Sequence, residues 1–210
     1  MYGAFFHLDV KDGVRVLRLE SGDGTNLLTR ACVMSLQAVF QDLQSEGRPL
    51  VLTGNEKFFS AGADLGEVAA LSAPRAYEFS KMGQELMRTV DEFPLPVYAA
   101  ISGYCLGGGL DLALACHRRI ASPNAVFGHR GAALGLITGW GGTQRLPRLV
   151  GRGVASQMLV AAEKVNANAA LGIGLVGAVA DGPVAEAVRA IHGLAIDAPS
   201  VACRRGSGIP

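Results

Sequence analysis

Three consecutive glycines, Gly107 to Gly109, place the strongest constraint on how this chain can fold. An apolar run at residues 97–102 precedes them, and a helix is predicted over residues 108–116. Inside a helix each glycine costs about 1 kcal/mol relative to alanine, so the run needs a physical reason. A helix start presents unpaired N–H groups with a partial positive charge, and glycine lets a ligand approach them. The segment therefore predicts either a ligand at this helix start or close packing of the helix on a neighbouring strand.

The rest of the chain alternates between short apolar runs and helical periodicity. Strands are predicted at residues 4–10, 13–20, 50–53, 97–102, 119–121 and, more weakly, 175–180. Helices are predicted at residues 29–44 with Thr29 as the cap, and at 74–92, 108–116, 152–163 and 184–194. Lys11, Asp12 and Gly13 between the first two strands indicate a hairpin. Such alternation is typical of an α/β protein.

Length and charge narrow the possible functions. The 210 residues are half hydrophobic, which predicts one domain over residues 1–195 and a flexible tail at 196–210. A net charge of +1 does not predict binding to nucleic acid or to an anionic membrane. The apolar stretch at residues 95–116 contains Pro96, several glycines and Asp111, so we do not expect it to span a bilayer.

The four cysteines show neither metal-site nor redox-motif spacing, and the N-terminus lacks the features of a signal peptide. These observations predict a cytoplasmic protein with buried free thiols and no metal site.

A second strand-to-helix turn repeats the chemistry of the glycine run. The small residues Ala61, Gly62 and Ala63 follow the apolar run at 50–53, and Asp64 can cap a helix after them. Small side chains allow a ligand to approach the backbone. Taken alone, the turn is explained equally well as an ordinary capped connection.

Four motifs in order resemble the crotonase (enoyl-CoA hydratase/isomerase) superfamily. They are residues 59–64, residues 103–109, Phe127-Gly128 followed by residues 139–147, and residues 174–176. The resemblance covers about residues 5–195. It implies an α/β fold built as a spiral of ββα turns, with the C-terminal helical region shortened. It also implies an acyl-CoA thioester as substrate, no further cofactor, and a homotrimer or a dimer of trimers.

The resemblance implies an oxyanion hole formed by the backbone N–H groups of Ala63 and Gly108. Two such donors polarise the thioester carbonyl, and each contributes about 2.7–4 kcal/mol to catalysis in comparable sites. The substrate-binding residues that the resemblance implies are Ala63, Asp64, Leu65, Gly66, Gly108 and Gly131.

The chain departs from the family at the acid–base residues. Hydratases of the family use two glutamates, and the corresponding positions here are Asp111 and Gly131; a third position that holds an aspartate in some members is Gly139. Hydration needs both a base and an acid, whereas one carboxylate can move a proton between two carbons. We therefore expect isomerisation or another enolate reaction (decarboxylation or thioester cleavage), with Asp111 as a catalytic residue beside Ala63 and Gly108. The alternative is a non-catalytic acyl-CoA-binding or scaffolding homologue, in which Asp111 only stabilises the helix dipole.

The sequence leaves the roles of three further features open. His129 could act as an acid or base near neutral pH, and Arg130 could bind a carboxylate or phosphate. Alternatively, both face solvent or a neighbouring subunit. Gln84 either faces the acyl pocket, as its counterpart does in some relatives, or is a solvated helix residue. A basic patch at residues 117–119 favours the non-catalytic alternative.

Overall fold

The computed structural model describes the backbone of residues 5–196 and the side chains of residues 5–193. Strands and helices alternate along the chain. The strands are β1 (Phe6–Lys11), β2 (Val14–Leu19), β3 (Leu27–Leu28), β4 (Leu50–Thr53), β5 (Phe58–Ser60), β6 (Gly62–Ala63), β7 (Val97–Ile101), β8 (Tyr104–Leu106), β9 (Arg118–Ala121), β10 (Val126–Gly128), β11 (Lys164–Asn166) and β12 (Ala178–Val179). The helices are α1 (Arg30–Gln44), α2 (Leu65–Ala69), α3 (Ala73–Asp91), α4 (Gly108–Ala115), the short 3-10 helix η1 (Gly131–Leu134), α5 (Gly142–Val150), α6 (Arg152–Val160), α7 (Ala167–Gly172) and α8 (Pro183–Ile196).

The strands form three sheets. The largest has the order β1-β2-β4-β7-β9-β12, and all its pairings are parallel except β1 with β2. The second sheet has the order β11-β10-β8-β5, and β3 pairs with β6. Each turn of the chain adds one strand to the first sheet and the next strand to the second sheet. These pairs are β4 and β5, β7 and β8, and β9 and β10, and helices follow them. This arrangement confirms the predicted spiral of ββα turns.

Local signals in the sequence set the ends of the first elements. Asp12 and Gly13, in the turn between β1 and β2, have φ angles of 50° and 77°. These left-handed values are typical of a tight hairpin turn. The Thr29 hydroxyl accepts a hydrogen bond from the Cys32 N–H at 3.1 Å and caps α1. The predicted hairpin and helix cap are both confirmed.

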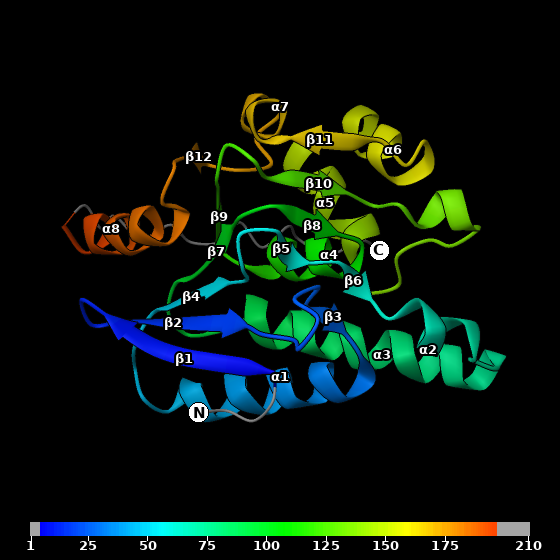
Figure 1. Ribbon diagram of the computed structural model, residues 1–210, viewed down its shortest axis with the longest axis horizontal. Helices are drawn as coiled ribbons and strands as arrows, with labels where there is room; N and C mark the ends of the chain where they lie inside the picture. Colours follow the sequence, from blue (N-terminus) through cyan, green and yellow to red (C-terminus); the bar gives the residue numbers. More distant parts are fainter. Residues whose placement is uncertain (1–4, 197–210) are drawn as a thin grey trace, which may run out of the picture.

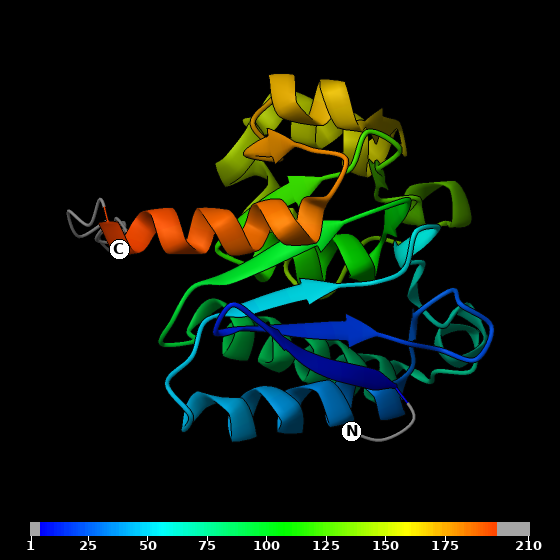
Figure 2. The ribbon, with the colours of Figure 1, turned by 60° about the vertical axis from the view of Figure 1, so that its left-hand side comes forward.

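Helices cover both faces of the six-stranded sheet. On one face α1 and α3 lie side by side (Figure 1), and Phe40 and Leu86 are fully buried there. On the other face α8 crosses β4, β7 and β9 (Figure 2), where Val188 packs in a cluster with Val51 and Tyr98. Between α3 and α5 lies α4, which also packs on β5, β6 and β8 and is buried from Gly109 to Ala115. The start of this enclosed helix is therefore held in place from several directions.

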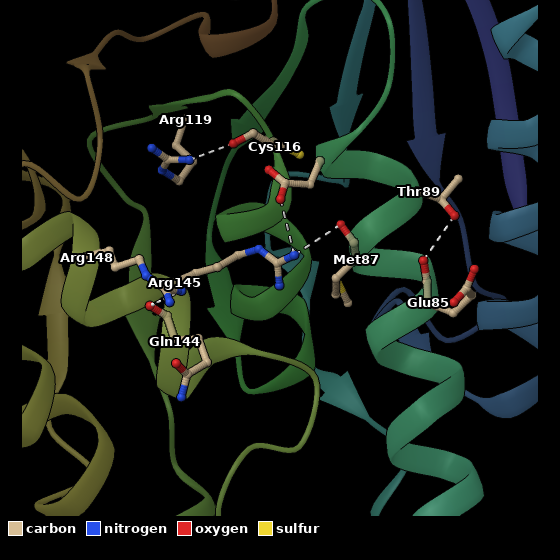
Figure 3. Close-up of polar contacts among 9 residues, drawn as sticks. Glu85, Met87, Thr89, Cys116, Arg119, Gln144, Arg145 and Arg148 are labelled. Carbon is tan, nitrogen blue, oxygen red and sulfur yellow. Dashed lines mark hydrogen bonds and ion pairs between the residues drawn. The ribbon is translucent and has the colours of Figure 1, made fainter. Parts of the chain in front are cut away.

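The basic run that follows α4 lies only partly at the surface, because His117 and Arg118 are exposed and Arg119 is buried. Arg119 is only 9% exposed, and its guanidinium donates to the carbonyl oxygen of Leu175 at 2.8 Å. It also donates to the carbonyl oxygen of Cys116 at 2.8 Å (Figure 3). The Nδ1 atom of His117 accepts the Val97 N–H at 3.0 Å. Two of the three residues therefore bind backbone groups and help to hold this part of the fold together.

Three cysteines are buried and free, as predicted: Cys32, Cys105 and Cys116. Burial raises the pKa of Cys32 to about 12. Cys203 and the tail predicted after residue 196 lie outside the described residues, as does any further C-terminal helical region. Among the helices within residues 5–196, none is both long and apolar enough to cross a membrane.

Candidate active site

Two strand-to-helix turns meet at the start of α4. A Cβ atom built on Gly62 would lie 3.1 Å from the Gly108 nitrogen and 2.7 Å from the Leu106 carbonyl oxygen. A Cβ atom built on Gly108 would lie 3.3 Å from the Ala63 nitrogen. Gly62 also has a φ of 98°, a conformation that favours glycine. The glycines therefore allow the backbone nitrogens of Ala63 and Gly108 to approach one another.

The Gly108 N–H is the first of α4. The first hydrogen bond within this helix is donated by Asp111 to the Gly107 carbonyl at 3.0 Å, so Gly108 has no acceptor within its own helix. Gly107, the capping residue, has a φ of 49° and donates its own N–H to the Gly128 carbonyl at 2.9 Å. The Gly108 N–H thus lies at the positive end of a well-anchored helix.

The indole of Trp140 fixes this helix start. A Cβ atom on Gly108 would lie 2.5 Å from the indole Cζ3, and one on Gly83 of α3 would lie 2.1 Å from Cδ1. Trp140 is only 3% exposed, and its Nε1–H donates to the Phe79 carbonyl at 3.2 Å. The indole therefore fills the space between α3 and α4, and neither glycine can gain a side chain without moving it.

Both backbone donors line a cavity of about 390 Å³. Most of the lining is apolar, from α2, α3, β8 and the loop around η1: Leu65, Val68, Leu71, Phe79, Leu106, Leu134, Leu136 and Ile137. Side chains of Ser80, Asp111, His129, Arg130 and Thr138 supply its polar groups. A mostly apolar cavity with a few convergent polar groups suits a small organic ligand.

Asp111 lies one helical turn into α4 and is 1% exposed. Its Oδ2 accepts a hydrogen bond from the Thr138 hydroxyl. Burial raises the pKa of Asp111 to about 7, although the Thr138 hydrogen bond and the charge of Arg145 act in the opposite direction. Arg145 reaches from α5 to α3, where it donates to the Met87 carbonyl at 3.5 Å (Figure 3). A carboxyl group with a pKa near neutrality can both accept and return a proton.

His129 lies beside this carboxyl group and does not face solvent. It is 3% exposed, and its Nε2 is 3.5 Å from the Asp111 Oδ1. Within the described residues, neither of these two buried atoms has a hydrogen-bond partner. Burial lowers the pKa of His129 to about 4, so the imidazole is neutral at neutral pH and the contact is then no ion pair. The solvent-facing alternative is wrong for His129, whereas Arg130 is exposed and donates to the Ala162 carbonyl at 3.4 Å.

Gly131 begins η1 and lies on the cavity wall without room for a side chain. A Cβ atom there would be 2.9 Å from the Leu136 carbonyl oxygen. The Leu136 N–H donates back to the Gly131 carbonyl at 2.9 Å and closes the loop. At Gly139 an added Cβ would lie 2.7 Å from the Ser80 hydroxyl oxygen. The Leu136 backbone therefore excludes a side chain at Gly131, whereas at Gly139 the Ser80 hydroxyl would have to move.

Of the remaining predicted residues, one lines the cavity and the others lie outside its lining. Leu65 lines the cavity and is 53% exposed. Asp64 and Gly66 do not line it; Asp64 caps α2 by accepting the Glu67 N–H at 3.0 Å. Gln84 is exposed and outside the lining, and it donates to the Gly139 carbonyl at 2.7 Å. Its contribution is to hold the loop next to the cavity.

Sequence reasoning missed two residues that shape the site, Thr138 and Trp140. Thr138 contacts Asp111 across 27 positions of sequence, and no local pattern indicates that contact. Trp140, the only tryptophan, is flanked by Gly139 and Gly141. A large aromatic residue among glycines was a visible sign of close packing.

Comparisons with known proteins agree with this architecture. The family model described as enoyl-CoA hydratase/isomerase matches residues 9–202. A crotonyl-CoA hydratase of Syntrophomonas wolfei is 40% identical over 172 residues, which are 80% of this chain and 66% of that protein. A short-chain-enoyl-CoA hydratase of Clostridium acetobutylicum is 37% identical, with 83% of this chain and 68% of the relative covered. The chain thus spans about two thirds of the length of these curated relatives.

Solved structures show the same likeness. An enoyl-CoA hydratase from Bacillus anthracis superimposes with a TM-score of 0.85 at 35% identity, covering 91% of this chain and 77% of that one. An enoyl-CoA hydratase from Thermoplasma volcanium gives a TM-score of 0.87 at 30% identity, covering 93% and 79%.

Proposed function

Since the chain belongs to the enoyl-CoA hydratase/isomerase family, we propose that it binds an acyl-CoA thioester and stabilises an enolate formed from it. The observation that carries this proposal is the approach of the Ala63 and Gly108 nitrogens at the wall of a largely apolar cavity. An acyl chain is apolar, and its thioester oxygen gains negative charge when the α-proton leaves. Two backbone N–H groups directed at that oxygen would each contribute about 2.7–4 kcal/mol to its stabilisation.

Asp111 is the proposed proton carrier. It lines the same cavity as the two donors, and its raised pKa of about 7 suits transfer in either direction. In the proposed isomerisation, the Asp111 carboxylate removes an α-proton from a 3-enoyl thioester and the C–H electron pair moves onto the thioester oxygen. When the enolate collapses, the γ-carbon takes up a proton and the double bond moves between Cα and Cβ. The substrate loses one proton and gains one, so the enzyme returns to its starting state.

Isomerisation is favoured over hydration because of the loop at Gly131. The family resemblance places the second glutamate of hydratases at this position, and here the Leu136 carbonyl occupies the space that its Cβ would need. A single carboxylate is sufficient for a 1,3-proton transfer but does not supply both the acid and the base of water addition.

Hydration is the second candidate, because the relatives at 40% and 37% identity are named as hydratases. It would need another polar group near Asp111 to help hold a water molecule. A purely scaffolding role is less well supported: burying a carboxyl group costs free energy that a scaffold has no need to spend.

Turnover of two substrates tests the proposal. With 3-hexenoyl-CoA we expect conversion to the 2-enoyl isomer, and with crotonyl-CoA only slow hydration. Asp111→Asn should lower isomerisation by about 100-fold or more, the scale of acid–base catalysis. Asp42→Asn, an exposed substitution on α1, is the matched control and should leave the rate unchanged. Efficient hydration of crotonyl-CoA that survives Asp111→Ala would overturn the assignment.

We also propose that the protein assembles as a homotrimer or a dimer of trimers, the states implied by the family. Size-exclusion chromatography with light scattering measures the mass directly. A monomer at all concentrations would refute this part of the proposal.

A further inference from the structure

We infer that His129 is a second proton-transfer residue of this cavity, exchanging one proton with Asp111 across the contact between Nε2 and Oδ1. The inference rests on the proposed acyl-CoA chemistry, because it assigns a further residue to the same reaction. It goes beyond the single-carboxylate mechanism by giving the proton two positions on the enzyme instead of one.

The first support is the pairing of two buried atoms that lack partners. The Nε2 of His129 and the Oδ1 of Asp111 are 3.5 Å apart, and neither is satisfied elsewhere within the described part of the chain. Buried polar atoms are rarely left without a hydrogen bond, since each such atom costs about 1–3 kcal/mol. One proton between them, or a substrate proton delivered to either, removes this cost.

The absence of a side chain at Gly142 leaves room for Asp111 and His129 to lie close to one another. A Cβ atom there would lie 2.2 Å from the Asp111 Oδ1 and 2.9 Å from the His129 Nε2. Any other residue would therefore intrude on both atoms. The backbone of α5 begins at Gly142, so the helix start leaves open the space that the two side chains share.

Few other charged groups lie near enough to Asp111 and His129 to exchange a proton with them. Of the described residues that line the cavity, only Asp111, His129 and Arg130 have titratable side chains. Arg130 donates to the Ala162 carbonyl, and Arg145 of α5 acts on Asp111 through its charge. Thr138 donates to the other carboxyl oxygen, Oδ2, which leaves Oδ1 available to the imidazole. Asp111 also feels the backbone N–H of Gly142, and burial together with the charge of Asp111 raises the pKa of the Cys105 thiol. His129 is nevertheless the titratable side chain of the cavity lining that contacts Asp111.

The proposed step balances as follows. The Asp111 carboxylate takes the α-proton while the C–H electron pair moves to the thioester oxygen. The new Oδ1–H then gives its proton to the His129 Nε2, which restores the carboxylate and forms an imidazolium. The imidazolium N–H donates that proton to the γ-carbon as the enolate electrons return, so both residues end as they began. Because burial keeps the pKa of His129 below that of Asp111, the transfer to His129 is uphill and the imidazolium is short-lived, but it is correspondingly a strong acid toward the γ-carbon.

Substitution of His129 by glutamine gives the first test. Glutamine can keep a hydrogen bond to the carboxyl group but cannot carry the proton. We expect His129→Gln to lower isomerisation of 3-hexenoyl-CoA by about 100-fold, with the dissociation constant for butyryl-CoA changed by less than about two-fold, which is under 0.5 kcal/mol. His192→Gln, an exposed substitution on α8, is the matched control and should be without effect. Turnover of His129→Gln within about three-fold of wild type would overturn the inference, since acid–base residues contribute far more.

The pH profile separates proton transfer from a structural role. Loss of a proton-transfer group should change the shape of the kcat profile, whereas loss of packing should lower all rates together. Failure of the proposed function is also distinguishable. If Asp111→Asn retains full turnover, the acyl-CoA mechanism itself is wrong; if Asp111→Asn is inactive and His129→Gln is active, only the role of His129 is wrong.

Nitrogen-15 NMR of the His129 ring provides a test that needs no turnover and no variant of His129. In the wild-type protein the ring signals should show an inflection near pH 7, because the Asp111 carboxyl group titrates there at 3.5 Å distance. The inflection should disappear in Asp111→Asn. A wild-type ring that shows no inflection near that pH, or an inflection that persists in Asp111→Asn, would overturn the proton-sharing contact.

Discussion

Replacement of Asp111 by asparagine is expected to stabilise the folded protein increasingly as the pH rises, while it removes activity. The carboxyl group has a pKa of about 7 in the folded protein, against an ordinary value of 3.8 for aspartate. Above about pH 4 the unfolded chain releases this proton, whereas the folded protein retains it up to about pH 7. The folded state therefore binds more protons across this window, and the contribution of Asp111 to stability falls as the pH rises. Asparagine has no such titration.

The size of the effect follows from the difference of about three between the folded and ordinary pKa values of Asp111, since a difference of one corresponds to about 1.36 kcal/mol. The full penalty is about 4 kcal/mol, and about 3 kcal/mol of it develops between about pH 5 and pH 8.5. For a domain of this length, that predicts a Tm advantage of the variant that grows by about 6–12 °C over this range. This pH window lies above the pKa of His129, which is about 4, so the imidazole is neutral throughout it and contributes no titration of its own.

Urea unfolding followed by the fluorescence of Trp140 is a direct assay, because this single tryptophan lies at the site. The difference in the free energy of unfolding between Asp111→Asn and wild type should be measured at about pH 5 and about pH 8.5. Asp42→Asn, exposed on α1, is the control and should follow wild type. A difference for Asp111→Asn that is independent of pH, or one that shrinks as the pH rises, would refute the argument that burial raises this pKa.

Further substitutions probe the surroundings of the cavity. Gly108→Ala places a Cβ atom 2.5 Å from Trp140, so we expect a loss of about 1–3 kcal/mol in urea unfolding and at least a ten-fold fall in kcat as the N–H donor moves. Gly131→Glu should not create an efficient hydratase, because its Cβ meets the Leu136 carbonyl at 2.9 Å; a large gain in crotonyl-CoA hydration would contradict this. Thr138→Val removes the hydroxyl group that lowers the pKa of the catalytic carboxyl, so the acidic limb of the kcat profile should move to higher pH. An unchanged limb would show that this hydroxyl does not tune the reaction.

Much of the fold could be predicted because its signals are local. The turn at Asp12 and Gly13 needs left-handed backbone, and the Thr29 cap marks the start of α1. The short strands of the second sheet, such as β8 and β10, were not predicted because three residues carry too little periodicity. Their pairing depends on contacts between distant parts of the chain.

The residues of the candidate site could likewise be predicted only where their signals are local in the sequence. The backbone donors at Ala63 and Gly108 could be found from glycine-rich turns in a recognisable order. The burial of His129 could not, since a histidine beside an arginine is equally compatible with the surface. Its place in the cavity depends on how the loop after β10 folds back over α4, a tertiary feature that also brings Thr138 to Asp111.

Infrared spectroscopy of a bound acyl-CoA labelled with carbon-13 at the thioester carbonyl tests the central claim most directly. If the N–H groups of Ala63 and Gly108 polarise this carbonyl, its stretching frequency should be lower in the complex than in free solution, and it should remain lowered in Asp111→Asn. A bound thioester whose carbonyl frequency equals that of the free ligand would contradict the account.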